Sequence, residues 1–200
     1  KKLIDFILSI QKNIKSKYSY EIGNASEAYF LLSHHAEHIK KRIGLLVLQT
    51  QGINIINNNK LLLQKLIRKI TEEYELILDN NLYKRTILED KNESNPIISP
   101  SDIGFHNVLV DKFDQLLFFD FEYAGWDDPH KTLSDLIIHP QFYIKKDLFY
   151  ILLPLIDQYV SEDIDKIRLE IVLKLYRLKW AMIILNNLIQ NLNNNSIDKI

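Results

Sequence analysis

Two short apolar runs interrupt a chain that is otherwise patterned for long helices, and they constrain its fold more than any other feature. Residues 108–110 and 116–119 consist of Val, Leu and Phe, and the more polar residues 111–115 between them suit a hairpin turn. Both runs are continuously apolar rather than alternating, which predicts a hairpin buried on both faces. The chain must therefore fold as a body of helices around one internal β-hairpin.

Helical periodicity dominates the rest of the sequence. Apolar residues recur three and four positions apart before the hairpin, and Asp128-Pro129 after it is typical of a helix N-cap followed by Pro at the first helical position. The predicted helices cover residues 2–15, a segment capped by Ser26 that reaches Val47, and residues 61–78, 129–138, 142–159 and 164–192. Residues 51–59 are predicted as a loop and 79–101 as a connecting segment. The predicted fold class is mainly α (α+β).

Composition narrows the class of protein. The chain has 200 residues, of which 46% are hydrophobic and 26% charged, and this is ordinary for a globular protein. It has no cysteine, which excludes disulfides and thiolate metal sites, and its net charge of -1 favours neither nucleic acid nor an anionic membrane. The apolar runs are too short for a membrane span. We therefore expect a cytoplasmic protein with no nucleic-acid partner and no membrane partner.

Three polar residues flank the predicted hairpin. If its turn centres between Phe113 and Asp114, Asn107 lies directly opposite Asp120, and opposed residues have Cβ atoms about 4.5–5.5 Å apart. An amide oxygen and a carboxylate at that distance can share one hard cation. Asp102, on the loop that leads into the hairpin, can accept a hydrogen bond from an incoming hydroxyl and orient it.

A simpler interpretation exists for each residue taken alone. Asp102 could be an ordinary loop residue, Asn107 a turn residue and Asp120 a buried partner of a lysine. The order of the three residues, the apolar strands beside them and the helix cap that follows favour a functional site over three separate structural roles.

Residues 99–129 resemble the aminoglycoside phosphotransferase and choline kinase family, relatives of protein kinases whose catalytic loop reads His-Gly-Asp-x-x-x-x-Asn. The resemblance implies that Asp102 is the catalytic residue. It also implies that Asn107 and Asp120 hold Mg²⁺ and, through it, ATP. Asp128, in Gly125-x-x-Asp-Pro129, and Asp135, before Leu136, match later family elements that brace the loop.

The loop departs from the family pattern at two positions. Pro100 stands where the family has the loop His, and it has neither a side-chain donor nor a backbone N–H with which to replace it. Gly104 stands where many members have a second His, whereas His106 lies two places further on. These departures put the geometry of the loop in question.

The resemblance covers the helical C-terminal lobe of a protein-kinase-like fold. The chain has five glycines, none of them in a Gly-rich phosphate loop, and no strand with a phosphate-pairing Lys precedes the helices. We expect residues 1–200 to form this single lobe, with the nucleotide-binding lobe before residue 1. The chain alone is then expected to bind ATP weakly and to transfer no phosphate.

Further residues are candidates for binding the acceptor. Glu122, Tyr123 and Trp126 follow the metal-binding Asp and are predicted to line the acceptor mouth, although Trp126 could instead pack beneath the loop. An acidic cluster suits either a cationic acceptor or the first turn of a helix headed by Ser161, and we favour the helix. Its members are Asp157, Glu162, Asp163 and Asp165.

Three histidines invite a zinc interpretation, because His34 and His38 are one helical turn apart and His35 lies between them. No third ligand with an orienting partner is identifiable, so a solvated helix face is favoured.

The function predicted first is an ATP-dependent small-molecule kinase that transfers the γ-phosphoryl group to an alcohol hydroxyl. Its partners are a nucleotide and a small hydroxyl-bearing acceptor, and its cofactors are Mg²⁺ and ATP. A pseudokinase-like binding or scaffold module is the alternative, motivated by Pro100 and the missing lobe. A structural helical domain, in which the hairpin acids are incidental, is a third.

Overall fold

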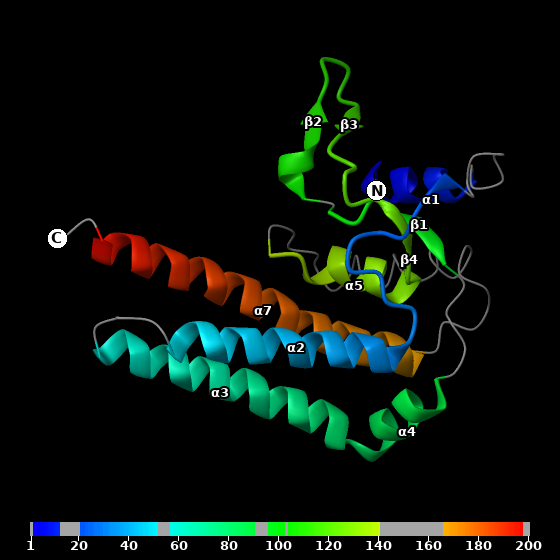
Figure 1. Cartoon of the computed structure of the whole chain (residues 1–200). Helices are drawn as coiled ribbons and strands as arrows, with labels where there is room; N and C mark the ends of the chain where they lie inside the picture. The colour runs from blue at the N-terminus through cyan, green and yellow to red at the C-terminus, as the bar shows by residue number, and fades with distance from the viewer. Residues whose placement is uncertain are drawn as a thin grey trace.

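The computed structural model describes residues 2–12, 21–51, 57–90, 96–102, 104–140 and 166–197. Within these ranges the chain is mainly helical with two small antiparallel sheets, which confirms the predicted class (Figure 1). The helices are α1 (Lys2–Lys12), α2 (Leu32–Gln51), α3 (Asn57–Asp79), α4 (Asn81–Glu89), α5 (Pro129–Ile138) and α7 (Lys166–Ile197). The strands are β1 (Ile97–Ser99), β2 (Val108–Val110), β3 (Leu116–Phe118) and β4 (Gly125–Asp127).

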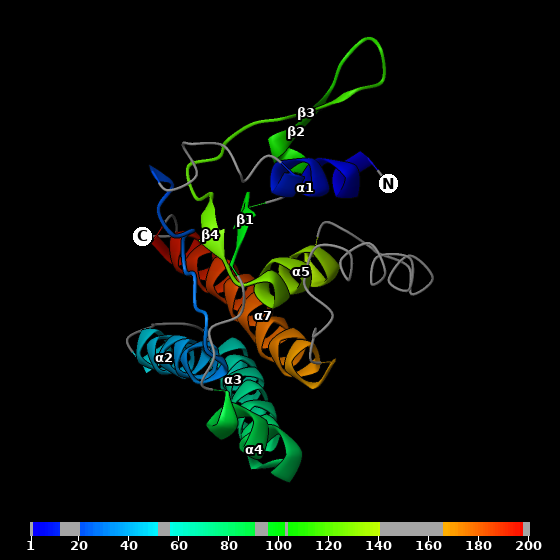
Figure 2. The same ribbon diagram turned by 90° about the vertical axis from the view of Figure 1, so that its right-hand side faces the viewer.

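The hydrophobic core lies where α2, α3 and α7 pack side by side. Ile39, Ile43 and Leu46 recur at helical spacing along α2 and are buried against α7, where Ile171 and Leu175 are fully buried. Burying one such side chain contributes about 1.5–3 kcal/mol. α5 packs across α7, between the three-helix core and the strands, as the rotated view shows (Figure 2). The core thus supports the site through α5 and α7.

The start of α2 differs from the prediction. Ser26 lies in a turn, and the helix begins only at Leu32, whose backbone N–H donates to the Asp90 carboxylate at 2.7 Å. Asp90 also pairs with Arg168 of α7. The prediction of a Ser26 cap was wrong because the group that satisfies this N-terminus comes from a distant part of the sequence.

The segment predicted as a connection contains both a helix and a strand. Asn80 caps α4, since its side-chain oxygen accepts hydrogen bonds from the N–H groups of Leu82 and Tyr83 at 3.1 and 3.2 Å. Asn is a preferred N-cap residue, so this signal was present in the sequence. β1 then pairs with β4, with Ile98 opposite Trp126.

Both edges of the β1–β4 pair are covered. Trp126 exchanges backbone hydrogen bonds with Gly23 and Ala25, each 2.9 Å long. On the other side, Gln11 of α1 uses its side-chain amide to bond both the N–H and the C=O of Ile98. Gly125 is required in β4, because a Cβ atom there would lie 2.4 Å from the Gly23 carbonyl oxygen.

The predicted hairpin is present as β2 and β3, but it is not buried on both faces. Leu109, Val110 and Leu117 are 59%, 63% and 52% exposed. The hairpin extends away from the helical core (Figure 1). Phe118 is covered on one side by the ring of Phe6 of α1, which stacks on it at a centroid distance of 3.9 Å. The burial prediction was wrong because an apolar run shows how much surface could be covered, not whether anything covers it.

Several predicted features fall wholly or partly outside the described residues. They include the helix over 142–159, Ser161 and the acidic residues Asp157, Glu162, Asp163 and Asp165. No helix in the described ranges is long and apolar enough to cross a membrane.

Candidate functional site

A tight turn positions Asp102 at the end of β1. Ser101 has a left-handed backbone with φ of 63°, and its N–H donates to Ser99 Oγ at 3.0 Å. The N–H of Asp102 donates to the Pro100 carbonyl at 2.9 Å. Left-handed residues other than glycine are uncommon and concentrate at functional sites. The turn leaves the Asp102 side chain 38% exposed.

His106 folds back over Gly104 to reach Asp102. Its Nε2 lies 3.3 Å from Asp102 Oδ2, and a Cβ atom added to Gly104 would fall 2.1 Å from the imidazole Cε1. Gly104 and His106 are therefore linked, because the His106 ring occupies the space that a side chain at position 104 would need. Sequence reasoning missed this contact, although the Asp–His spacing of four residues was a signal.

Asn107 is buried at the base of β2 and tied to the loop. Its N–H donates to the Gly104 carbonyl at 3.0 Å, and its side-chain Nδ2 donates to the Asp102 carbonyl at 3.1 Å. Because a carbonyl can only accept, this bond fixes the orientation of the amide, with Nδ2 rather than Oδ1 toward the Asp102 carbonyl. Asp102, the candidate catalytic residue, and Asn107, the candidate metal ligand, are thus directly hydrogen-bonded.

The pairing of Asn107 with Asp120 differs from the prediction by one residue. Val108 pairs with Phe118, and the Asn107 carbonyl accepts from the N–H of Phe119, not of Asp120. The predicted register was wrong because the turn centres on Phe113. A single-residue shift would place Asp120 on the other face of a regular strand. Asp120, however, has φ of 62°, so strand alternation no longer determines the direction of its side chain.

Tyr123 links the acids on the two sides of the hairpin. Its pKa is raised by a hydrogen bond with Glu122, and further by the negative charges of Glu122, Asp120 and Asp102. Asp102 and Asp120 therefore both act on the same phenol, although they are eighteen positions apart in the sequence.

A polar cleft of about 420 Å³ opens beside Asp102. Arg42 of α2, Asp135 of α5 and Trp180 of α7 line it together with Tyr123. Of the predicted acceptor-binding residues, Tyr123 lines the cleft, Glu122 is exposed beside it, and Trp126 lies half-buried in β4. The structure thus brings Asp102, Tyr123 and Asp135 around one cavity.

Ion pairs within the lining hold the cleft in shape. Asp135 accepts from Lys179 Nζ at 3.0 Å and from the Trp180 indole Nε1 at 3.2 Å. Glu27 pairs with Arg42. Burial alone raises the pKa of Glu27, but the hydrogen bond from His38 and the charge of Arg42 outweigh burial and lower it to about 2. The predicted bracing residue Asp135 thus forms part of the cleft wall.

Asp128 is fully buried beneath the site. It caps α5 as predicted, accepting from the N–H of His130 at 2.6 Å, and it also pairs with Arg168 and His35. Burial raises the pKa of Asp128, yet hydrogen bonds from His130 and His35 and the charge of Arg168 hold it well below its usual range. Next to it, Asp127 pairs with Lys131, and burial raises the Asp127 pKa to about 6.

The histidines of α2 do not form a solvated face. His34 is exposed, but His35 is fully buried and His38 is 9% exposed. The expectation was wrong for the last two because distant residues supply their partners: Tyr176 for His35 at 2.9 Å, and Tyr29 for His38 at 3.0 Å. Within the described ranges, no group of three or more His, Cys, Asp or Glu is arranged to hold a metal ion.

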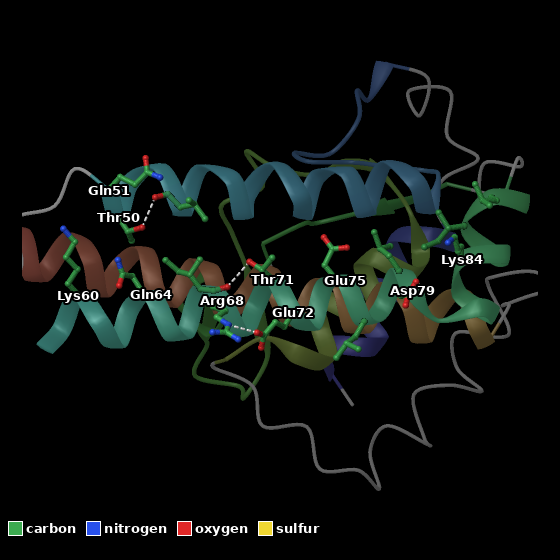
Figure 3. A pocket seen from close by; sticks show the side chains of 16 residues that line it. Thr50, Gln51, Lys60, Gln64, Arg68, Thr71, Glu72, Glu75, Asp79 and Lys84 are labelled. Atoms are coloured by element: carbon green, nitrogen blue, oxygen red, sulfur yellow. Dashed lines mark hydrogen bonds and ion pairs between the residues drawn. The ribbon is translucent and has the colours of Figure 1, made fainter. Parts of the chain in front are cut away.

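A larger groove of about 1420 Å³ runs along α3, between α2 and α4 (Figure 3). Thr50 and Gln51 lie on its α2 side, and Arg68 pairs with Glu72 along α3. None of the candidate site residues lines this groove, so it is separate from the cleft beside Asp102.

Comparisons of the chain with protein-family models, with curated proteins and with solved structures found no match.

Proposed function

We propose that this chain supplies the catalytic loop, the metal ligands and the acceptor side of an ATP-dependent small-molecule kinase with a protein-kinase-like C-terminal lobe. The observation that most supports this proposal is the position of Asp102. It lies on a strained turn at the wall of a polar cleft, and its own backbone carbonyl is bonded to the candidate metal ligand Asn107.

Asp102 orients the hydroxyl that receives the phosphoryl group. His106 contacts Oδ2 of this carboxylate, and we assign to Oδ1 the hydrogen bond from the substrate hydroxyl. This hydrogen bond aligns the lone pair of the hydroxyl oxygen with the γ-phosphorus. The Asp102 carboxylate accepts the hydroxyl proton as the new O–P bond forms, while the bond from the γ-phosphorus to the β–γ bridging oxygen breaks and ADP leaves. His106 limits rotation of the carboxylate, so the geometry is set before the acceptor binds.

The residues present suit a magnesium–nucleotide complex. Asn107 offers an amide oxygen whose orientation is fixed, and Asp120 offers an exposed carboxylate on a left-handed residue. Both are hard oxygen donors of the kind Mg²⁺ prefers, with its remaining ligands coming from water and phosphate oxygens. When bound, Mg²⁺ neutralises charge on the transferring phosphate.

The test compares Asp102→Asn with Asp114→Asn in the complete product of the gene that encodes this chain. Asp114 is exposed on the hairpin turn, so its variant is a matched control. Asp102→Asn is expected to lower kcat by about 10²–10⁴-fold while leaving nucleotide affinity nearly unchanged. Asp120→Ala is expected to abolish magnesium-dependent nucleotide binding. Full activity of Asp102→Asn would refute the role given to Asp102.

A binding module without catalysis is the second candidate. The observation that favours it is the register, because Asn107 faces Phe119 rather than Asp120 across the hairpin. This candidate predicts nucleotide binding that is absent or independent of Mg²⁺, with no effect of Asp102→Asn on any measured property of the complete protein. Calorimetric titration of ATP with and without Mg²⁺ separates the two candidates.

A further inference from the structure

One face of α3 is left exposed by the rest of the described chain. The helix lies on the side of the core away from the strands, and Ile67, Ile70 and Tyr74 bury its inner face (Figures 1 and 2). Exposed residues run along the opposite face in steps of three and four, as helical periodicity requires. We call these residues the α3 stripe: Leu61, Lys65, Arg68, Glu72, Glu75 and Leu76.

The charges of the α3 stripe are segregated along the helix. Its bases, Lys65 and Arg68, precede its acids, Glu72 and Glu75. The helix dipole favours the opposite order, and α3 has no acid in its first turn and no base in its last turn. Arg68 does pair with Glu72 at 2.7 Å, but a base four residues before an acid is the weaker order for such a pair. The stability of α3 alone therefore does not explain the segregation.

Two charges of the stripe are available to another molecule. Lys65 and Glu75 are exposed, and neither has an ion-pair partner within the described ranges. They lie about 15 Å apart along the helix, which is too far for them to pair with each other inside α3. A partner for either charge would have to come from a second molecule.

The order of the charges is symmetric about the level of Ile70. Arg68 and Glu72 lie two positions before and after it, and Lys65 and Glu75 lie five positions before and after it. In an antiparallel pair of α3 helices with a two-fold axis at this level, each base lies opposite an acid of the other copy. In a parallel pair every base would face a base. The stripe is thus self-complementary in the antiparallel arrangement alone.

Leucines of the stripe lie beside these charges. Leu61 is 55% exposed and Leu76 is 65% exposed. In the same antiparallel register, Leu61 lies within one helical turn of the partner's Leu76, so the two side chains can pack together at both ends of the contact. The register that matches the charges therefore also covers apolar surface.

We propose that the α3 stripe is a docking surface for a second copy of this chain. Lys65 meets the partner's Glu75, and the Arg68–Glu72 pairs of the two copies come together at the axis as one cluster of alternating charges. The contact does not depend on the proposed kinase function, since none of its residues lines the cleft beside Asp102. It is smaller than a standard interface of about 1,600 Å², so we expect a weak dimer with a Kd of about 0.1–1 mM.

Sedimentation equilibrium of the 200-residue chain, at concentrations up to about 0.5 mM, measures the dimer directly. Raising NaCl from about 0.05 M to about 0.5 M should weaken self-association at least about fivefold, because salt screens exposed ion pairs. A chain that stays monomeric throughout this range at low salt overturns the proposal. A dimer whose Kd does not change with salt overturns the charge pairing on which the register rests.

Charge reversal locates the contact. One variant combines Lys65→Glu with Arg68→Glu, and the other combines Glu72→Lys with Glu75→Lys. Each variant alone should self-associate at least about tenfold more weakly than the wild type, because like charges then face each other across the axis. An equimolar mixture of the two should form a heterodimer at least as tight as the wild-type dimer. All four positions are exposed, so circular dichroism should show an unchanged helix content.

The matched control combines Lys40→Glu with Lys41→Glu. These exposed residues of α2 lie outside the stripe, and the variant makes the same change in net charge as Lys65→Glu with Arg68→Glu. The control should dimerise with an affinity within about twofold of the wild type. Self-association that survives in both stripe variants would place the interface elsewhere. Loss of self-association without recovery in the mixture would show that the stripe does not pair with itself.

Discussion

Glu27 shows at the residue scale how the cleft wall depends on pH. It lies in the turn before α2 with φ of 53°, and it pairs with Arg42 and with His38 at 3.5 Å. Burial opposes ionisation of its carboxyl, but these two partners together lower its pKa from 4.5 to about 2. The carboxylate thus remains ionised in the folded protein at pH values where it is protonated in the unfolded chain.

The pH dependence of stability follows from that difference. A folded-state pKa below the unfolded value gives stability that is complete above about pH 4.5 and is lost as the pH falls toward 2. Because the side chain is 34% exposed, solvent screening reduces the contribution to the order of 1 kcal/mol. Glu27→Gln should therefore lower the free energy of unfolding at about pH 7 and have a smaller effect at about pH 3.

Urea unfolding of the wild-type protein and of Glu27→Gln, at about pH 7 and about pH 3, measures this effect. Glu72→Gln, which removes an exposed helix pair with Arg68, is the control and should change the free energy of unfolding by less than about 0.5 kcal/mol. If Glu27→Gln costs as much at the lower pH as at the higher, the ion pair is not the source of its stabilisation.

Asp128 and its partners Arg168 and His35 show, also at the residue scale, how charged groups can be held inside the fold. The Asp128 carboxylate meets Arg168 and His35, and His35 in turn accepts from or donates to the Tyr176 hydroxyl. Burial lowers the pKa of His35, although Asp128 opposes this, so the histidine is held neutral as a link in the chain of hydrogen bonds. These contacts join α2, α5 and α7.

At the scale of elements, α1 completes the sheet that positions the loop. Gln11 Nε2 donates to the Ile98 carbonyl at 2.6 Å, and Gln11 Oε1 accepts from the Ile98 N–H at 3.1 Å. A side-chain amide thus takes the place of a neighbouring strand and covers the edge of β1. Since β1 leads into Asp102, the docking of α1 influences the loop.

Gln11→Ala should release the edge of β1. Losing both bonds is expected to speed hydrogen exchange of the Ile98 amide by about tenfold, because that factor matches the net stabilisation that one or two hydrogen bonds provide. Lys12→Ala, an exposed change in the same turn of α1, is the control. Unchanged protection of Ile98 in Gln11→Ala would show that another group covers this edge.

At the scale of the whole molecule, stability is concentrated in the contact of α2, α3 and α7. Leu175 is fully buried there, whereas Leu188, further along the same helix, is 42% exposed. Leu175→Ala should lower the free energy of unfolding by about 2–5 kcal/mol through lost burial and an unfilled cavity. Leu188→Ala should cost less than about 1 kcal/mol. Urea unfolding measures both, and similar losses would place the core elsewhere.

Much of the local structure could be predicted from the sequence. The hairpin at 108–118, the Asp128 cap with Pro129 and the long amphipathic helices follow from residues close together in the chain, where backbone preferences and periodicity act. Asp102 and Asn107 were identified by their spacing in one loop, and the structure joins them by a hydrogen bond. Their proposed chemistry remains a prediction.

By itself the sequence determined the hairpin, most of the long helices and which polar residues lie near the hairpin, because those preferences are local, whereas it missed α4 and β1. Only the tertiary structure decided that Asp90 caps α2, that Tyr176 holds His35, and that Asn107 faces Phe119. It also decided that the apolar hairpin is largely exposed and that Arg42, Asp135 and Trp180 line one cleft beside Asp102. These outcomes depend on contacts between residues far apart in the chain, and local propensity contains no information about which distant group will be there.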